Sequence, residues 1–188
     1  MLKKLKMDYK SLLEEAGALL EGHFLLTSGL HSDKYIEKMR ILENPVLAEP
    51  FIERMKELSP ETDWFIGPTL GGAIIAFELA RMMGKKSAFA ERATQGRVLK
   101  RGFSIEKTDK IVIVDDILTT GSSIRDTIKS IDRGEITSIV VMIDRSMEDI
   151  AVDIPIKSVF KYPINNYKPE TCYLCEKGLE LTKRGGKK

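Results

Sequence analysis

The chain has 188 residues, of which 43% are hydrophobic and 31% are charged, so it can bury a core as one compact domain without disulfides. Its 30 basic and 28 acidic side chains leave a formal net charge of +2, which argues against the one-sided basic field of a nucleic-acid-binding protein. No apolar run approaches the ~20 residues of a membrane span and no N-terminal signal peptide is recognisable, which predicts a cytoplasmic protein.

The N-terminal part of the chain is expected to form a helix, two short strands and a second helix. Asp8 is a candidate N-cap for the first helix, which is predicted to end at Gly22. The apolar face of this helix comprises Leu12, Leu13, Ala16, Leu19 and Leu20. Strands at 24–26 and 35–36 follow around the turn at Ser28 and Gly29. Asn44 and Pro45 combine an N-cap with a proline at the first helical position, which predicts a helix through about Leu58.

The rest of the chain alternates strands and helices in the manner of α/β proteins. Strands are predicted at 64–66, 87–90, 111–114 and 138–143, and helices at 71–84 and about 122–131. The β-branched run at 111–114 indicates a strand covered on both faces, and its spacing from the next strand predicts a parallel pair joined by a helix. Residues 92–109 are polar and basic without a clear period, and the basic ends at 3–6 and 183–188 are expected to be solvated.

Cys172 and Cys175 form a Cys-x-x-Cys motif near the C-terminal end. Such a pair is half of a four-ligand zinc site, and the sequence has no second pair and no His-x-x-x-His to complete it. A redox dithiol usually begins a helix after a strand, which this proline-flanked tail does not indicate. We interpret the two cysteines as structural thiols; a redox pair and a metal bridged between subunits stay open.

The segment that follows the strand at 111–114 has the composition of a phosphate site. It consists of Asp115, Asp116, Ile117, Leu118, Thr119, Thr120, Gly121, Ser122 and Ser123. Ligands of open α/β sheets bind at the carboxyl ends of strands, and a helix N-terminus attracts anions. Four hydroxyls and a glycine suit a phosphate, whereas the two carboxylates would repel it and should face sugar hydroxyls or magnesium-bound water. The alternative is an ordinary turn in which Ser122 or Ser123 caps the helix.

The segment from Val114 to Ser123 resembles the phosphoribosyl pyrophosphate signature of type I phosphoribosyltransferases. Other segments are similar to the orotate phosphoribosyltransferases of that family; they lie at 22–35, 67–72, 91–92, 100–103, 143–145 and 167–175. The resemblance implies an α/β fold with a core at about 41–165, which is a mostly parallel sheet flanked by helices. Residues 1–40, approximately, and the C-terminal tail would form a small hood on this core. Thr27 and Gly71 stand where many members have lysine.

The resemblance also implies roles for individual residues. Asp115 and Asp116 would hold the ribose hydroxyls, and the loop through Ser123 would hold the 5′-phosphate. Arg92 would contact the pyrophosphate. Orotate would be bound by Thr119, Arg145, Tyr35 and Ile36. Arg145 has independent support, because a guanidinium at a strand end can bind the orotate carboxylate through two parallel hydrogen bonds. The alternative for Arg145 is a surface ion pair with Asp144 or Glu148.

The implied reaction is displacement of pyrophosphate by the orotate ring nitrogen, with Mg²⁺ held through substrate and water and no direct protein ligand. No side-chain nucleophile is required, and the two histidines are expected in turns. The segment between Arg92 and Gly102 is shorter than the family's flexible loop and lacks its lysine and histidine, so its candidates are Gln95, Arg97, Lys100 and Arg101. This segment is predicted to be a mobile lid. The resemblance implies that the lid reaches the active site of a neighbouring subunit, and therefore a homodimer. No nucleic-acid or membrane partner is expected.

Three alternatives remain from the sequence. A purine phosphoribosyltransferase would share the loop at 115–123 and differ in the hood. A regulatory RNA-binding protein on the same fold would require a basic face. A catalytically silent scaffold is compatible with the short loop segment.

Overall fold

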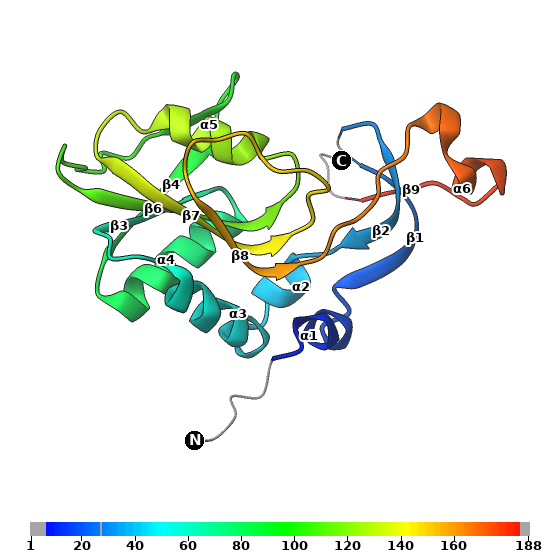
Figure 1. Cartoon of the computed structure of the whole chain (residues 1–188), viewed down its shortest axis with the longest axis horizontal. Helices are drawn as coiled ribbons and strands as arrows, with labels where there is room; N and C mark the ends of the chain where they lie inside the picture. The colour runs from blue at the N-terminus through cyan, green and yellow to red at the C-terminus, as the bar shows by residue number, and fades with distance from the viewer. Residues whose placement is uncertain (1–6, 27, 185–188) are drawn as a thin grey trace. The chain divides into compact units, whose positions relative to one another are not determined.

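The computed structural model describes residues 7–26 and 28–184, and it divides into two compact units (Figure 1). The central unit comprises Ala48–Pro163, and the terminal unit comprises the chain up to Leu47 together with the chain from Ile164 onward. Thr27 and the basic segments at 3–6 and 185–188 lie outside the described residues. None of the helices in the described part of the chain is long and apolar enough to cross a membrane.

The central unit is built on a six-stranded sheet with the order β5-β4-β3-β6-β7-β8. Every neighbouring pair is parallel except β4 and β5. The strands are β3 (Trp64–Pro68), β4 (Lys86–Arg92), β5 (Arg97–Leu99), β6 (Lys110–Leu118), β7 (Glu135–Asp144) and β8 (Ile156–Lys161). This architecture confirms the predicted α/β class with a mostly parallel sheet.

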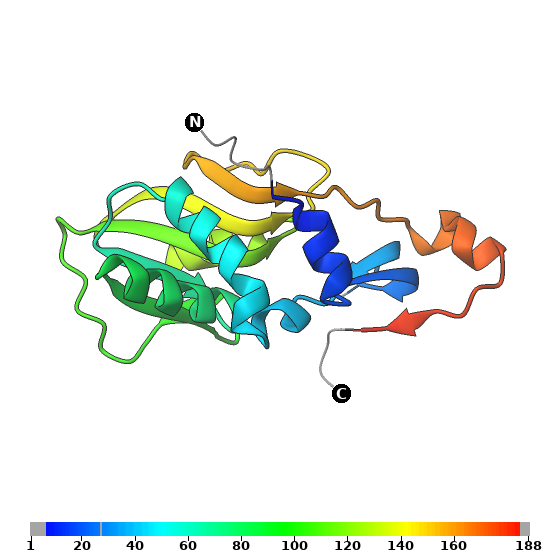
Figure 2. The same ribbon diagram turned by 90° about the horizontal axis from the view of Figure 1, so that it is seen from below.

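Helices cover both faces of this sheet (Figures 1 and 2). Helices α3 (Pro45–Leu58) and α4 (Gly71–Met83) lie on one face, and α5 (Ser122–Ser130) lies on the other. The predicted start and end signals of α3 and α4 are confirmed. The Asn44 side chain accepts the Val46 N–H at 3.1 Å, and Gly84 ends α4 in the left-handed conformation at φ 64°.

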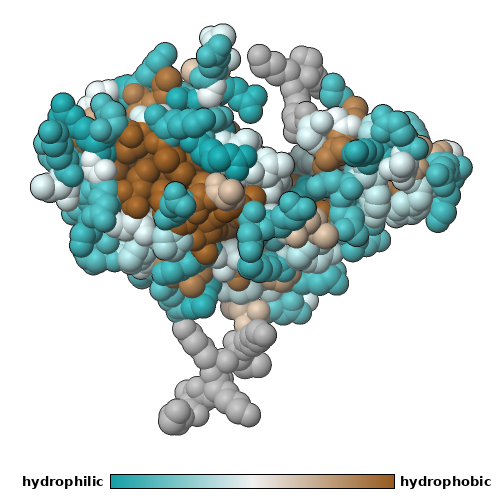
Figure 3. Space-filling model, turned by 45° about the horizontal axis from the view of Figure 1, so that its top comes forward, coloured by the Kyte–Doolittle hydropathy of each residue, from teal (hydrophilic) through white to brown (hydrophobic). Residues whose placement is uncertain are grey.

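Aliphatic side chains of the central strands form the core on the α5 face. Residues buried there include Ile66, Ile111, Ile113, Ile124, Ile139 and Val141. β3 is buried at every position and β6 at all but two, as expected of parallel strands covered on both faces. Partly accessible side chains packed against the cluster include Leu99, Phe103, Val152 and Ile154. Figure 3 shows a hydrophobic area on one face of the central unit, bordered by hydrophilic side chains.

β6 is longer than predicted. The strand continues through Leu118, so that Asp115 and Asp116 belong to it and do not follow it. The cause is β7, which pairs with β6 as far as Leu118 opposite Asp144. Inter-strand hydrogen bonds thus override the low strand propensity of aspartate.

The terminal unit contains a three-stranded sheet with the order β2-β1-β9. Its elements are α1 (Tyr9–Glu15), β1 (Leu19–Leu25), β2 (His31–Ile36), α2 (Met39–Leu42), the short 3-10 helix η1 (Pro169–Thr171), α6 (Tyr173–Glu176) and β9 (Thr182–Lys183). Both histidines lie in strands and are buried, which corrects the expectation that they occupy turns.

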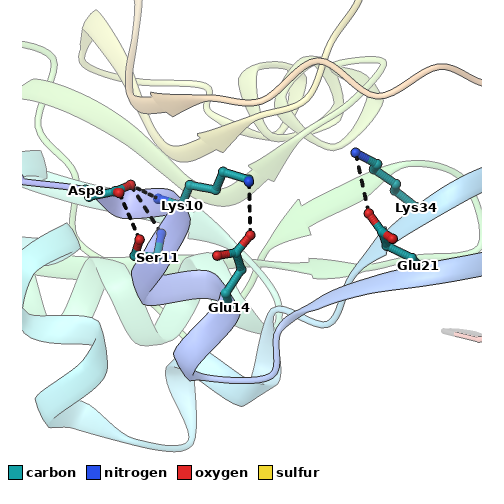
Figure 4. A network of polar contacts seen from close by, with 6 residues as sticks. All are labelled: Asp8, Lys10, Ser11, Glu14, Glu21 and Lys34. Atoms are coloured by element: carbon teal, nitrogen blue, oxygen red, sulfur yellow. Dashed lines mark hydrogen bonds and ion pairs between the residues drawn. The ribbon is translucent and has the colours of Figure 1, made fainter.

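Helix α1 begins as predicted but ends earlier. The Asp8 carboxylate accepts the N–H groups of Lys10 and Ser11 and the Ser11 hydroxyl (Figure 4). The Ser11 hydroxyl and backbone hydrogen bonds lower the pKa of Asp8 below its ordinary value. The helix was predicted to continue to Gly22, but Gly17 ends it at φ 60°, with the Ala18 N–H bonded to the Leu13 carbonyl.

Candidate functional site

The order of the strands predicts a ligand site at the carboxyl ends of β3 and β6. The chain leaves β3 through α4 to reach β4 on one side, whereas β6 lies on the other side of β3. Connections that diverge in this way open a crevice at the carboxyl ends of the two strands. The segment that follows β3 and the segment that ends β6 therefore border the same region.

Two buried carboxylates lie in this region. Asp115 is 6% exposed and Asp116 is 1% exposed. One oxygen of Asp115 accepts the N–H of Asp116 at 2.8 Å, and one oxygen of Asp116 accepts the N–H of Ile117 at 2.7 Å. Hydrogen bonds from the backbone to a charged acceptor are among the strong ones, so the main chain of β6 fixes the direction of both carboxylates.

The N-terminus of α4 packs directly against these carboxylates because it begins with glycines. A Cβ at Gly71 would lie 1.6 Å from Asp116 Oδ2, and a Cβ at Gly72 would lie 2.9 Å from the Val114 carbonyl oxygen. A Cβ at Gly67 would lie 2.0 Å from the Gly72 carbonyl oxygen. The positive end of the α4 dipole is thus brought against the negative charge of Asp116, a contact that any side chain at Gly71 would obstruct.

The loop from Thr119 to Ser123 presents hydroxyls at the N-terminus of α5. Thr119, Thr120 and Ser122 are exposed, and Ser123 is half-buried. Gly121 is the N-cap at φ 72°, and no side chain caps the helix, so the alternative in which Ser122 or Ser123 acts as the cap is wrong. A Cβ at Gly121 would lie 2.5 Å from Ile150 Cγ2, so both the conformation and the packing require glycine there. A helix N-terminus without a side-chain cap is a suitable site for a phosphate.

Arg97 extends from β5 to the two loops of this region. Its guanidinium donates to the Ala90 carbonyl at 3.0 Å, and it contacts the Thr69 carbonyl and hydroxyl and the Ser123 hydroxyl at 3.4 Å each. Burial lowers the pKa of Arg97, the charge of Arg92 lowers it further, and Asp115, Asp126 and Asp116 raise it. The group stays protonated in any case, so a positive charge lies beside the phosphate-type loop.

The segment predicted as a lid forms a hairpin with β4. Arg92 pairs with Arg97, and Glu91 with Val98, while the Ala93 N–H donates to the Gly96 carbonyl at the turn. The pairing brings two guanidinium groups to one end of the hairpin. Arg101 instead forms an ion pair with Glu91 at 2.7 Å, and Lys100 is exposed. Of the three cationic loop candidates, Arg97 is the one that contacts the site.

Arg145 lies at the carboxyl end of β7, beside the start of the loop. Its N–H donates to the Leu118 carbonyl at 3.0 Å, and the residue is 7% exposed. The neighbouring Asp144 carboxylate accepts the Ser146 N–H and hydroxyl at 3.0 and 2.6 Å and lies 3.9 Å from Lys161 Nζ. Arg145 is therefore buried and not on the surface, and its binding of orotate stays a prediction.

The two remaining predicted residues belong to the terminal unit. Tyr35 and Ile36 are neighbours at the end of β2. Ile36 is buried, and the ring of Tyr35 packs against Phe24 with centroids 5.6 Å apart. Sequence reasoning missed the close approach of Gly71 and Gly72 to the carboxylates, although two consecutive glycines at a helix start were its signal.

Comparisons with known proteins point to one family. The family model of the phosphoribosyl transferase domain matches residues 46–176. The orotate phosphoribosyltransferase of Caldicellulosiruptor bescii is 38% identical over 187 residues, which cover 97% of this chain and 98% of that protein. The orotate phosphoribosyltransferase of Aeropyrum pernix has a similar structure, with a TM-score of 0.71 at 24% identity over 92% of this chain and 98% of that one.

An adenine phosphoribosyltransferase is also similar in structure. The adenine phosphoribosyltransferase of Thermoanaerobacter pseudethanolicus gives a TM-score of 0.57 at 18% identity over 69% of this chain and 88% of that one. At such identities the structural likeness shows the shared fold alone. The choice between orotate and a purine therefore rests on the sequence match along almost the whole chain.

Proposed function

We propose the reaction of this chain from its family: it belongs to the phosphoribosyltransferases and, within them, to the orotate phosphoribosyltransferases. It transfers 5-phosphoribosyl from phosphoribosyl pyrophosphate to orotate. The products are orotidine 5′-monophosphate and pyrophosphate, a step of pyrimidine biosynthesis. The observation that carries the proposal is the juxtaposition of two oriented, buried carboxylates with an uncapped helix N-terminus rich in hydroxyls.

The loop and the carboxylates bind different parts of the sugar phosphate. The exposed hydroxyls of Thr119, Thr120 and Ser122 and the N–H groups at the start of α5 bind the 5′-phosphate. Asp115 and Asp116 accept hydrogen bonds from the ribose hydroxyls, because carboxylates directed by the main chain are preorganised acceptors. This division keeps the carboxylates away from the phosphate that they would repel.

Magnesium fits the chemistry of these residues. Mg²⁺ prefers oxygen ligands and keeps several waters when it is bound with phosphates, and the two aspartates offer carboxylate oxygens at the strand end. Asp115 and Asp116 would hold the ion through its water and the sugar hydroxyls. When bound, the ion supplies positive charge that stabilises the pyrophosphate leaving group.

The arginines of the hairpin act on the leaving group. Charge moves from the ribose to the pyrophosphate as the bond to the anomeric carbon breaks, so cations next to the pyrophosphate stabilise the transition state. Arg92 and Arg97 are cross-strand neighbours, and Arg97 contacts Ser123. Both are suited to bind pyrophosphate oxygens, and the hairpin would close over the substrate and exclude water.

A cation is the proposed ligand of orotate. Arg145 binds the carboxylate of the base, and its burial between strand ends restricts its rotamers. Thr119 would contact the ring, while Tyr35 and Ile36 would line the base pocket. Competition between orotate and purine bases for turnover tests this specificity directly.

A second copy of the chain is the proposed partner. Leu70, Ile74 and Phe77 are 63%, 40% and 64% exposed, and their spacing puts them on one side of α4. An exposed apolar stripe on a helix marks an interaction surface. Because α4 begins at Gly71 against Asp116, a homodimer formed through this stripe would bring the partner close to the site.

The test of the proposed function is turnover with orotate, phosphoribosyl pyrophosphate and Mg²⁺ in wild type and in Asp115→Asn and Asp116→Asn. Each variant loses a charged acceptor worth about 2–3 kcal/mol in the transition state, which predicts a rate loss of roughly 30- to 150-fold. The matched control is Asp132→Asn, an exposed aspartate after α5, which should keep wild-type turnover. Wild-type rates in both site variants, with unchanged folding by circular dichroism, would refute the assignment.

A further inference from the structure

All four histidine and cysteine side chains of the protein meet at one place in the terminal unit. The chain contains two histidines and two cysteines, and they are His23, His31, Cys172 and Cys175. One ligand atom from each lies within 4.8 Å of the others. Three of the four residues are buried, and Cys175 is at the surface. The proposed transferase reaction uses none of these side chains.

The distances between the four ligand atoms approach those of a tetrahedral metal site. His23 Nε2 lies 3.0 Å from His31 Nδ1, 3.5 Å from Cys172 Sγ and 3.7 Å from Cys175 Sγ. Cys175 Sγ lies 3.3 Å from His31 Nδ1. Around a tetrahedral Zn²⁺, neighbouring ligand atoms stand about 3.3 Å apart for two nitrogens and about 3.5 Å apart for nitrogen and sulfur. The four atoms therefore require only small movements to enclose a zinc ion.

A hydrogen bond on the far side of His23 orients its ring. His23 Nδ1 lies 2.9 Å from the Leu179 carbonyl oxygen, which can only accept, so Nδ1 carries the proton and donates it. The lone pair of the neutral ring is then on Nε2, the atom that faces the cluster. Histidines that bind metals commonly donate their other ring N–H to a carbonyl or carboxylate in this way.

The fold assembles this cluster through pairing at both ends of the C-terminal tail. The pairing of β1 with β2 shifts between Glu21 and Phe24, an irregularity of the kind that redirects a side chain, and His23 lies within it. Tyr167 pairs with His31 through two backbone hydrogen bonds of 2.8 Å, and β9 pairs with β1 at Phe24 and Leu25. The Cys-x-x-Cys segment between these anchors is thereby held over the two histidines.

We propose that His23, His31, Cys172 and Cys175 bind one structural Zn²⁺ within a single chain. Two thiolates neutralise the ion and the two imidazoles are neutral, so the complete site carries no net charge and can be buried at low cost. Two sulfur and two nitrogen ligands in a tetrahedron suit zinc better than magnesium or calcium. A disulfide would involve only the cysteines and would not explain why the ring nitrogens of two buried histidines lie 3.0 Å apart beside them.

The metal would supply stability that the tail otherwise lacks. From Ile164 to Arg184 the buried hydrophobic residues are Ile164, Cys172 and Leu174, whereas Leu179 and Leu181 are 49% and 41% exposed. A segment with so small a core usually depends on a cross-link or a metal. Zinc at the four ligands would connect the tail to β1 and β2.

The test is metal analysis of the full-length protein, purified under reducing conditions and dialysed with a weak chelator. Inductively coupled plasma mass spectrometry should find about one zinc per chain. Cobalt(II) added to the metal-free protein should give the intense visible bands of tetrahedral thiolate coordination. Zinc should raise the melting temperature by roughly 10 °C when it is present at about 1,000 times its dissociation constant, and it should protect the Lys177-Gly178 bond from trypsin.

Variants separate this site from the transferase site. Cys175→Ser and His31→Gln should weaken zinc binding by more than about 100-fold. Tyr173→Phe, a change between the two cysteines that removes no ligand, should keep the zinc. Asp116→Asn should also keep it, whatever happens to turnover, so a failure of either assignment can be recognised without the other.

Two results would overturn the inference. One is wild-type protein that contains no zinc and gives no cobalt spectrum after reduction. The other is a Cys172–Cys175 disulfide that forms in air while zinc is present. Both measurements use the unaltered chain, so misfolding of a variant cannot obscure them.

Discussion

Replacement of Gly71 by alanine tests the contact between α4 and the carboxylates of β6. The new Cβ would lie 1.6 Å from Asp116 Oδ2 and 2.6 Å from its Cγ, so the groups must separate by about 1.8 Å to reach ordinary contact. Asp116 is buried, and its other oxygen is bonded to the Ile117 N–H. Overpacking of this kind costs about 1–3 kcal/mol of stability, and a shift of about 1 Å in a catalytic group lowers the rate on the order of 100-fold.

Gly84→Ala is the matched control, because it makes the same chemical change at the other end of α4. Gly84 has φ 64°, and a Cβ there would meet nothing within 4 Å. Left-handed strain should therefore cost about 1 kcal/mol of stability without altering turnover. Denaturant unfolding and kcat/KM for both substrates are measured in the two variants. If Gly71→Ala retains wild-type kcat/KM, the close approach of α4 to Asp116 has no part in catalysis.

Four further predictions concern other parts of the molecule. Arg145→Lys should raise the KM for orotate roughly 10- to 100-fold and leave that for phosphoribosyl pyrophosphate unchanged, because lysine cannot form the bidentate pair; equal weakening of both would indicate a structural arginine. Amide hydrogen exchange of residues 93–101 should slow when phosphoribosyl pyrophosphate and Mg²⁺ bind, and unchanged exchange would exclude a closing lid. Hydrogen bonds from the Glu106 N–H and then the indole of Trp64 lower the pKa of Asp109 below the ordinary 3.8, so its contribution to stability is present above pH 3.8 and is lost as the pH falls through the lower folded value. Fluorescence of this single tryptophan should show that transition, and Asp109→Asn should abolish it. Phe77→Glu should convert a dimer into monomers in sedimentation velocity without loss of stability, and a dimer that persists would place the interface elsewhere.

Sequence patterns were most reliable where one local signal determines the structure. Asn44 and Pro45 mark the start of α3, and Gly84 marks the end of α4, because capping depends on neighbouring residues. The apolar period predicts too long a first helix, because the leucines at 19 and 20 continue that period. In the structure the helix ends before them, at Gly17. A glycine that can adopt positive φ outweighed the hydrophobic period there.

The candidate site was predictable to the extent that it lies in one continuous segment. The loop at 115–123 combines its carboxylates, hydroxyls and glycine within nine residues, so its chemistry can be recognised from the sequence. Arg97 was less distinct, because its approach to Ser123 depends on the pairing of β5 with β4. The two glycines at 71 and 72 indicated a close approach at the start of α4, but the sequence could not identify Asp116 as the partner, since that contact depends on two strands that lie side by side only in the folded sheet.

The proposed zinc ligands could not be brought together by a local search of the sequence. His23 and Cys172 are 149 positions apart, and the histidines are too widely spaced to match a His-x-x-x-His motif. What joins them is the pairing of Tyr167 with His31 and of β9 with β1, which returns the C-terminal tail to the N-terminal hairpin. A Cys-x-x-Cys in a tail with little core of its own should thus be compared with histidines on the strands that the tail pairs with, because zinc ligands have to meet in space and need not be close in the sequence.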